Sequence, residues 1–223
     1  MISGHATLAS AHVLFTHYHP RATRIEFSTR SRGSLTAVRD RSTGSIALDL
    51  PKSSLVTLEE GHRRRGEILR GVEKVVERDD VVRIDWADEI AACVVELSDR
   101  VDLEHLEFDP FVLISIGEFM IILTQPAPVG SGFDIHSRVF GPDVEVPEDP
   151  VTGSAHTALA PFWISGPSLS RLRNPENVAR TSTLRAKQVS KRGGELLVSY
   201  DEDKGRVELR GWAKEVMSGQ LTL

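Results

Sequence analysis

One stretch, residues 148–163 (EDPVTGSAHTALAPFW), restricts the fold of this 223-residue chain more than any other. Asp149 is a favourable N-cap and Pro150 suits the first helical position, so the stretch predicts a helix that begins at these residues. Gly166 and Pro167 end the pattern. Because the first-turn N–H groups of a helix lack partners within it, we expect this helix to start at an anion-binding site. The predicted buried face consists of Val151, Ala155, Ala158, Leu159 and Phe162.

Composition indicates one globular unit or two small lobes, since 40% of the residues are hydrophobic and 26% are charged. The net charge of −5 gives no general reason to bind nucleic acid or an anionic membrane surface. No apolar run approaches the ~18 residues of a membrane span, and the first residues lack the basic start of a secretory signal. The lone Cys93 excludes an internal disulfide and lies in an apolar run typical of a buried strand. We therefore expect a soluble, cytoplasmic protein.

Alternating patterns predict mostly antiparallel strands around two main helices. The first helix is expected to run from Gly4 towards His19, where the following proline ends it. Runs at 23–28, 34–39 and 45–50 are separated by turn residues and predict a three-stranded meander. Further strands are predicted at 73–76, 81–85, 91–97, 183–190, 195–201, 206–211 and 213–223, short helices at 55–60, 66–72 and 102–108, and a hairpin formed by 111–115 and 119–124.

Other conspicuous residues favour ordinary structural roles. His12 and His156 lie within helical stretches and are more typical of packed or hydrogen-bonded histidines than of catalysts. No spacing of His, Cys, Asp and Glu predicts a metal site. Residues 130–132 (GSG) lack the third glycine, the strand and the helix of a dinucleotide-binding loop. The basic run at 62–65 is flanked by glutamates, which indicates a solvated turn rather than a phosphate-binding patch.

Four segments carry a resemblance to a known family. Residues 138–142 (RVFGP) and 147–156 (PEDPVTGSAH) closely resemble the main signature of the phenazine-biosynthesis PhzF-like family, relatives of diaminopimelate epimerase. Residues 4–9 (GHATLA) and 192–196 (RGGEL) are similar to its other two signatures, in the family's order. The resemblance implies an α+β fold of two pseudo-duplicated lobes, each a curved, mostly antiparallel sheet around one central helix. The lobes expected here are residues 1–55 with 212–223, and residues 56–211.

The resemblance also implies an active site between the lobes, where the N-termini of the two central helices face one another. Diaminopimelate epimerase-like relatives carry a thiol at each helix start, but Ser3 and Thr152 stand there in this chain, so thiol-pair epimerisation is not expected. PhzF-like isomerases instead move a proton on a small unsaturated carboxylic acid without a cofactor. By resemblance, the catalytic residues are His5 and Asp149, and the substrate-binding residues are Gly4, Gly153, Ser154, Gly193 and Gly194.

The start of the chain departs from the family pattern. PhzF-like chains carry several dozen residues before the GHAT motif, including an S-E-T-A-F-like segment whose glutamate is the main acid/base, whereas this sequence begins at Met1. We therefore expect an incomplete first lobe, a partly uncovered helix at 4–15 and impaired proton transfer. Two functions remain open: a PhzF-like isomerase, or a catalytically inactive protein that binds small acids or a protein partner. The resemblance suggests a homodimer, and we expect no nucleic-acid or membrane partner.

Overall fold

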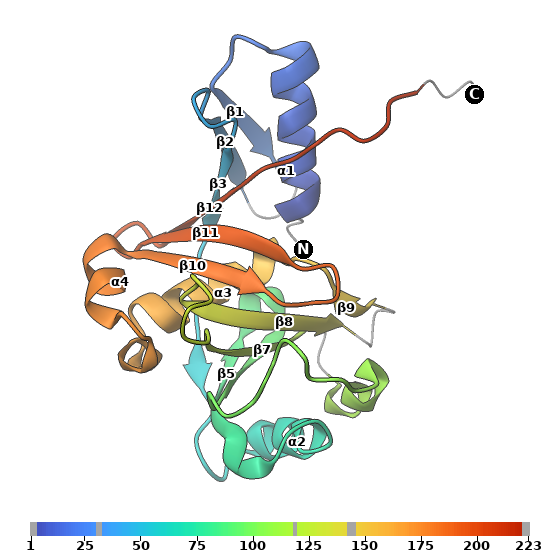
Figure 1. Cartoon of the computed structure of the whole chain (residues 1–223), viewed down its shortest axis with the longest axis vertical. Coiled ribbons are helices and arrows are strands. Elements are labelled where there is room, and N and C mark those ends of the chain that lie inside the picture. Colours follow the sequence, from blue (N-terminus) through green and yellow to red (C-terminus); the bar gives the residue numbers. More distant parts are fainter. Residues whose placement is uncertain (1–3, 30–32, 118–119, 142–145, 220–223) are drawn as a thin grey trace.

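A computed structural model describes residues 4–29, 33–117, 120–141 and 146–219 (Figure 1). Within these residues, twelve strands form one mixed sheet in the order β1-β2-β3-β12-β11-β10-β8-β7-β6-β5-β4, and β9 pairs with β8 beside this path. The strands are β1 Arg24–Ser28, β2 Ser34–Arg39, β3 Ile46–Pro51, β4 Val56–Thr57, β5 Val81–Ala87, β6 Ala92–Leu97, β7 Met120–Pro126, β8 Ile135–Gly141, β9 Val146–Asp149, β10 Thr183–Gln188, β11 Gly194–Asp201 and β12 Arg206–Gly211.

Four α-helices and several short turns of other helix types accompany the sheet in the described part of the chain. The α-helices are α1 Gly4–Val13, α2 Arg63–Val72, α3 Gly153–Ile164 and α4 Pro175–Thr181. A π-helical turn, η1 Leu14–Tyr18, continues α1, and the 3-10 helices are η2 Arg78–Asp80, η3 Asp88–Ile90, η4 Pro110–Ile116 and η6 Pro167–Arg171. No helix among these residues is both long and apolar enough to cross a membrane.

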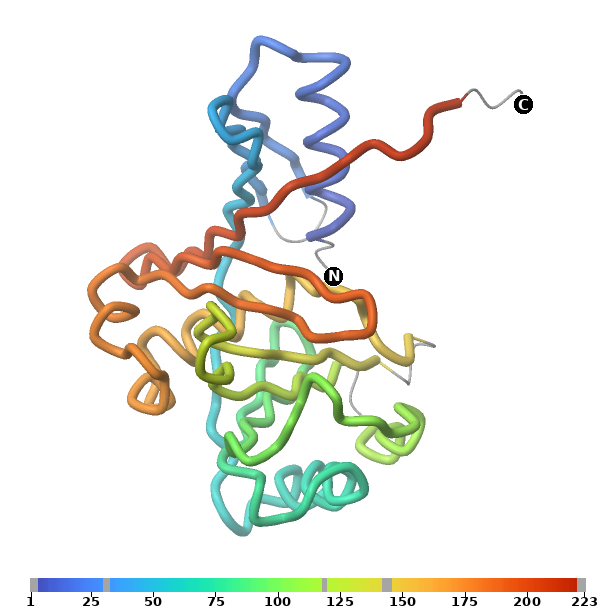
Figure 2. Tube along the Cα trace, in the orientation of Figure 1, coloured from blue at the N-terminus to red at the C-terminus, as the bar shows by residue number. Residues whose placement is uncertain are grey.

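The end of the chain joins the strands at its beginning. The predicted meander is confirmed as the antiparallel strands β1, β2 and β3. Strand β12 then pairs antiparallel with β3, where Val207 faces Leu50 and Gly211 faces Ile46. Parallel pairing occurs where β6 meets β7 and where β10 meets β8. The α1, β1 and β2 segment and the β4 to β8 segment therefore lie on either side of β3 and β12, as Figures 1 and 2 show. The expected lobe boundaries stay a prediction.

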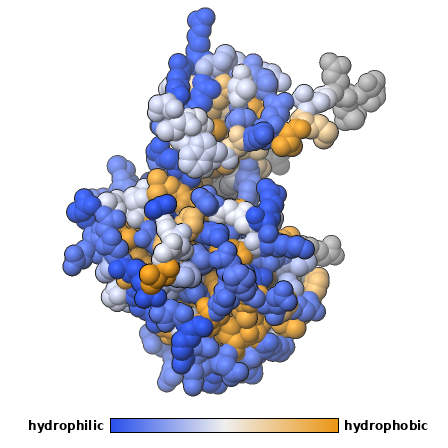
Figure 3. All heavy atoms as spheres, viewed as in Figure 1, coloured by the Kyte–Doolittle hydropathy of each residue, from blue (hydrophilic) through white to orange (hydrophobic). Residues whose placement is uncertain are grey.

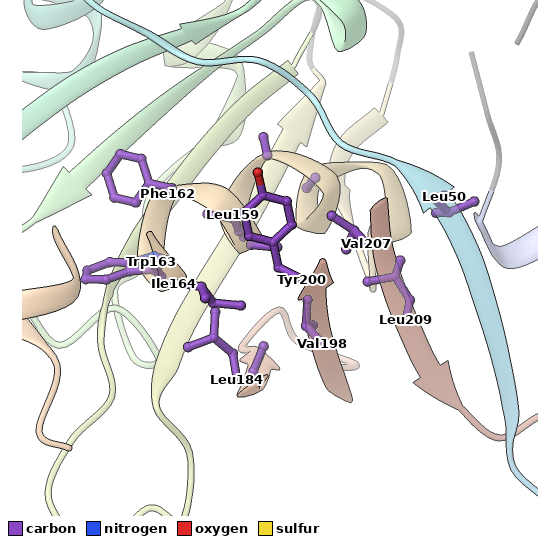
Figure 4. Packing of buried hydrophobic residues seen from close by; sticks show 14 of the residues in the cluster. Leu50, Leu159, Phe162, Trp163, Ile164, Leu184, Val198, Tyr200, Val207 and Leu209 are labelled. Atoms are coloured by element: carbon purple, nitrogen blue, oxygen red, sulfur yellow. The ribbon is translucent and has the colours of Figure 1, made fainter. Parts of the chain in front are cut away.

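Helix α3 is the buried centre of the molecule. Every residue of α3 except Pro161 is buried, so the helix is enclosed on all sides and not along one stripe as the sequence pattern predicts. Figure 4 shows apolar side chains of β10, β11 and β12 directed at it, among them Leu184, Val198 and Leu209. Small residues such as Ala155 and Ala158 let the strands come close to the helix backbone.

A second apolar cluster lies on the opposite face of the sheet. It joins α2 and η4 to alternate residues of β5, β6 and β7. The thiol of Cys93 is fully buried there on β6, which confirms its predicted place in a buried strand. Gly71 of α2 touches η4 so closely that an added β-carbon would lie 2.2 Å from Ile116. The predicted helix at 66–72 is confirmed as part of α2. Close packing against Ile116 explains the glycine at position 71.

Helix α1 is covered less completely than α3. Gly4 and Ala11 are its buried residues, and Phe15 in η1 adds a third contact to the core of the sheet. The remaining residues of α1 are exposed or half-buried, as expected for a partly uncovered helix. Residues 212–219 pass α1 as an extended segment, and His17 lies 2.5 Å from Glu215 across this contact (Figure 2).

The segment before β7 is helical, so the predicted hairpin is wrong. Asp109 starts the 3-10 helix η4 because its carboxylate accepts a hydrogen bond from the N–H of Phe111 at 3.0 Å, and Pro110 suits the first turn. Strand β7 then runs parallel to β6, with Ile122 opposite Val94. An apolar run without alternation fits a helical turn as well as a strand, and in η4 Leu113 and Ile116 are the buried residues.

Several short predictions are also wrong. Residues 55–60 contain the edge strand β4, since the N–H of Leu58 donates to Ile84 at the end of the β4–β5 pairing. Residues 73–76 and 102–108 form turns. Residues 213–219 form no strand, because the ladder ends where Gly211 faces Ile46, the first residue of β3. Residues 220–223 lie outside the described residues.

The enclosed position of α3 predicts a large cost for removing one of its apolar side chains. Replacing the fully buried Leu159 by alanine is expected to lower the free energy of unfolding by about 2–5 kcal/mol, because the helix cannot move to fill the cavity. The matched change Leu197→Ala, on β11 with 38% of Leu197 exposed, is expected to cost less than about 1 kcal/mol. Urea unfolding of both variants measures the difference, and equal losses would contradict the enclosure of α3.

Candidate active site at the meeting of two helices

The starts of α1 and α3 touch through two glycines. A β-carbon added to Gly4 would lie 3.1 Å from the Cα of Gly153, and one added to Gly153 would lie 3.1 Å from the Cα of Gly4. The two helix backbones are therefore in contact, and a side chain on either glycine would be crowded by the other helix. The two helices meet at their N-terminal ends, so the positive ends of both helix dipoles lie at this junction.

A cavity of about 380 Å³ opens at the junction. Its wall combines the first two turns of α1, the start of α3, the turn at 192–196 and the end of β12 with the following residue, Trp212. Four leucines, Leu8, Leu48, Leu196 and Leu209, give the wall apolar surface, and Arg192, Glu195 and Arg210 are its charged residues. The cavity therefore pairs a polar, electropositive end with an apolar body, a combination suited to a small organic anion.

Five of the seven site residues expected from the resemblance line this cavity. They are Gly4, His5, Gly153, Gly193 and Gly194. His5 is exposed at the cavity, while Ser154 is buried in the first turn of α3, where its carbonyl accepts a hydrogen bond from Thr157 at 2.7 Å. Asp149 and Ser154 are absent from the cavity wall described here. Ser3 lies outside the described residues.

Asp149 does not cap α3, which corrects the predicted helix start. It is the last residue of β9, paired with Val139 of β8, and Glu148 beside it forms a two-bond ion pair with Arg138 at 2.6 and 2.9 Å. This pairing keeps the segment extended, so the helix begins only at Gly153. The Asp149 carboxylate instead accepts a hydrogen bond from the Thr152 hydroxyl at 2.6 Å.

Gln188 holds the loop that precedes α3, a role that the sequence reading missed. Its amide oxygen accepts from the N–H of Thr152 at 2.8 Å, and its amide nitrogen donates to the Asp149 carbonyl at 2.6 Å and to the Thr152 hydroxyl at 3.2 Å. Gln188 is fully buried. The period-2 pattern of 183–190 already placed it on the same face as Leu184 and Ala186, and a polar residue on an apolar face was the available signal.

The glycine turn is tied to the same loop. Ser190 donates to the Pro150 carbonyl at 2.8 Å and accepts from the N–H of Gly193 at 3.0 Å. A β-carbon on Gly194 would lie 2.1 Å from Val151, so glycine is needed there for contact with this side chain. Gly194 thus admits the Val151 side chain, and its expected role in substrate binding stays a prediction.

His156 is packed and hydrogen-bonded, as its position in the sequence predicts. Its Nδ1–H donates to the Thr152 carbonyl at 2.8 Å, and the ring is fully buried in α3. Burial lowers the pKa of His156 to about 4; the bond to Thr152 opposes this shift, and the nearby charge of His5 adds to it. His156 is therefore a neutral imidazole at physiological pH.

The family model described as "Phenazine biosynthesis-like protein" (PhzC-PhzF) matches residues 1–219. The chain belongs to this family. It is 35% identical to phenazine biosynthesis-like domain-containing protein 1 of Mus musculus, an alignment that covers 99% of this chain and 73% of the mouse protein. It is 33% identical to a Pseudomonas aeruginosa protein named as an uncharacterized isomerase, over 100% of this chain and 73% of that protein.

Solved structures of the PhzF family have the same fold. The crystal structure of a PhzF family protein from Enterococcus faecalis matches with a TM-score of 0.74 and 26% identity, covering 100% of this chain and 74% of that one. A putative PhzC/PhzF protein from Clostridium difficile gives a TM-score of 0.74 at 25% identity. The predicted α+β class and the PhzF-like resemblance are both confirmed. The roles of the individual site residues remain predictions.

The buried state of His156 predicts a pH-dependent stability for this PhzF-like chain. The unfolded chain binds the proton near pH 6.5 and the folded chain near pH 4, so the free energy of unfolding is retained above pH 6.5 and falls as the pH drops towards 4. The expected loss from this residue is up to about 3 kcal/mol. Urea unfolding between pH 7.5 and 4.5 measures it. His156→Gln, which keeps a donor for Thr152, should show a shallower slope, and an unchanged slope would refute the assignment.

The contact between Asp149 and Thr152 predicts a measurable coupling. Asp149→Asn and Thr152→Val each remove part of the 2.6 Å hydrogen bond, and we expect each to lower stability by about 1–2 kcal/mol. The double variant should be less destabilised than the sum, since both changes remove the same bond. Unfolding of the four proteins gives the coupling energy, and strict additivity would show that the pair does not interact in solution.

Proposed function

We propose that this chain is a cofactor-independent isomerase of the PhzF-like class that moves a proton on a small unsaturated carboxylic acid. The observation that carries the proposal is the junction of Gly4 and Gly153, where two helix starts converge on a cavity that also contains His5. Membership of a family in which some proteins are named as isomerases supports it.

The helix junction suits a substrate carboxylate. The two helix starts meet there, and each helix end carries a partial positive charge of about half an elementary charge. Gly4 and Gly153 present no side chain there, which lets the two helix starts touch while both glycines line the cavity. The same field stabilises the extra negative charge that a carboxylic acid gains when a proton leaves the neighbouring carbon.

His5 is the residue best placed to move the proton. It lies in the cavity wall beside Gly4, and an imidazole both accepts and returns a proton near neutral pH. In the proposed reaction, one C–H bond breaks, the electron pair shifts along the unsaturated chain, and a C–H bond forms at another carbon. The substrate and product are isomers, so the step consumes no oxidant and no reductant.

Asp149 is proposed to act through the backbone of α3. Its carboxylate holds the Thr152 hydroxyl, and Thr152 directly precedes Gly153. This arrangement fixes the first turn of α3 relative to the cavity, so Asp149 serves as a positioning residue in this proposal. Ser154 lies in the same first turn of α3.

The proposed lobes are residues 1–55 with 212–223, and residues 56–211. This division is supported by the cavity, because its wall takes Gly4, His5 and Leu48 from one part and Gly153 and the glycine turn from the other. We also propose a homodimer in the cytoplasm, on family resemblance alone. A protein that binds the acid without turnover is the alternative function, and the same assay distinguishes the two.

Deuterium incorporation from heavy water into a panel of small unsaturated carboxylic acids tests the proposal. We expect His5→Asn to slow exchange by about 10²- to 10⁴-fold, because it removes the acid/base group. His12→Asn, on the same helix and outside the cavity wall, is the matched control and should leave exchange unchanged. The assay is run on the 223-residue chain and on this chain fused behind the N-terminal region of a longer relative.

The outcomes separate the two functions. Exchange that depends on His5 in either form supports the isomerase, and faster exchange in the fused form assigns part of the chemistry to the N-terminal region. Carboxylate-induced chemical-shift changes at Gly4 and Gly153 without exchange in either form would favour the binding protein. Exchange that survives His5→Asn unchanged would remove His5 from the mechanism.

A further inference from the structure

Trp212 is an exposed aromatic residue in the wall of the cavity. It is 63% exposed, whereas Trp86 and Trp163, the other two tryptophans of the chain, are buried. An exposed tryptophan is unusual enough to require a reason, since its large apolar surface stays in contact with water. The proposed function does not use it.

The indole of Trp212 is held in place. Its Nε1–H donates to the carbonyl of Thr43 at 3.2 Å, in the turn that precedes β3. The preceding residue, Gly211, pairs with Ile46 as the last pair of the β12–β3 ladder. The hydrogen bond thus holds the polar edge of the ring, and the strand pairing of Gly211 holds the adjacent backbone. A fixed ring loses little freedom when a ligand packs against it.

The surroundings leave the ring available to a ligand. In the part of the chain that the structure describes, no aromatic ring or cationic side chain is stacked on Trp212. The same cavity wall contains Leu8, Leu196 and Leu209, which give it apolar surface. The extended segment after Trp212 leads away from the sheet, and Figure 3 shows apolar surface on it beside the grey C-terminal atoms.

From this arrangement we propose that Trp212 is a specificity-determining residue of the cavity and selects acids whose body is planar and conjugated. The inference rests on the proposed function, in which the carboxylate occupies the helix junction. With that end fixed, the body of the acid extends along the leucine wall and its flat face stacks on the indole.

Stacking distinguishes planar from puckered acids for a geometric reason. A conjugated body presents a π face that approaches an indole closely and offset, while a saturated ring holds the indole away with its axial hydrogens. The conjugated carbons are also those between which the proton would move. Stacking on Trp212 would hold them in the cavity shared with His5, so binding preference and reactivity would select the same class of acid.

Tryptophan fluorescence tests the proposal directly. Benzoate and cyclohexanecarboxylate are the probes, because they have the same carboxylate and nearly the same size but differ in planarity. We expect benzoate to change the emission of the exposed Trp212, and to bind about five- to tenfold more tightly than cyclohexanecarboxylate, the size of an aromatic stacking preference. Trp86 and Trp163 are buried and contribute a constant background.

The variants Trp212→Leu and Trp212→Phe complete the test, with affinities taken from chemical shifts of the Gly4 and Gly153 amides. Trp212→Leu should abolish the preference for benzoate and leave the affinity for cyclohexanecarboxylate within about twofold, while Trp212→Phe should keep part of the preference. An unchanged pattern of amide shifts in the unliganded variants verifies that they fold.

Three results would overturn the inference. Equal affinity for both acids in the parent chain, or equal weakening of both by Trp212→Leu, would show that the ring does not stack, while the carboxylate site at the helix junction would stand. Binding of neither acid at the Gly4 and Gly153 amides would refute the carboxylate site of the proposed function as well as the stacking.

Discussion

The contact between the starts of α1 and α3 is the constraint on which the cavity depends. A side chain at either Gly4 or Gly153 would lie 3.1 Å from the other Cα, so any residue other than glycine would push the two helices apart. The fields of the two helix ends reinforce one another only while both ends point at the same place. This backbone contact brings both helix dipoles to one end of the cavity, whose wall also contains Arg192 and Arg210.

The two sides of this contact are supported very differently. On the α3 side, Gln188 joins Asp149 and Thr152 by three hydrogen bonds, and Ser190 ties the loop to the glycine turn. Loss of Gln188 would leave buried backbone groups without partners, which costs more than the bonds themselves contribute. On the α1 side, Gly4 and Ala11 are the buried residues of a partly uncovered helix. The cavity thus has one rigid wall and one wall held by few contacts.

Most of the fold was predictable where one face of an element is buried and the other is not. Strands β1 and β10 to β12 alternate in burial along much of their length, and the sequence reading placed them within a few residues. Strand β8 is buried on both faces, so it has no alternation and was missed. The start of α3 was misplaced because Asp149 has the local preference of an N-cap, but pairing of β9 with β8 and the ion pair of Arg138 with Glu148 outweigh that preference.

The candidate site shows a related limit of motif reasoning. A motif gives the same weight to residues that face a ligand and to residues that shape the backbone, and only the packing separates them. His5 lines the cavity, while the Asp149 carboxylate accepts a hydrogen bond from the hydroxyl of Thr152, the residue before Gly153. Trp212 belongs to none of the four segments that carry the family resemblance, yet it forms part of the wall. In the proposed isomerase, proton transfer therefore depends on the imidazole of His5, which lies in the cavity wall beside the contact of the two helix starts.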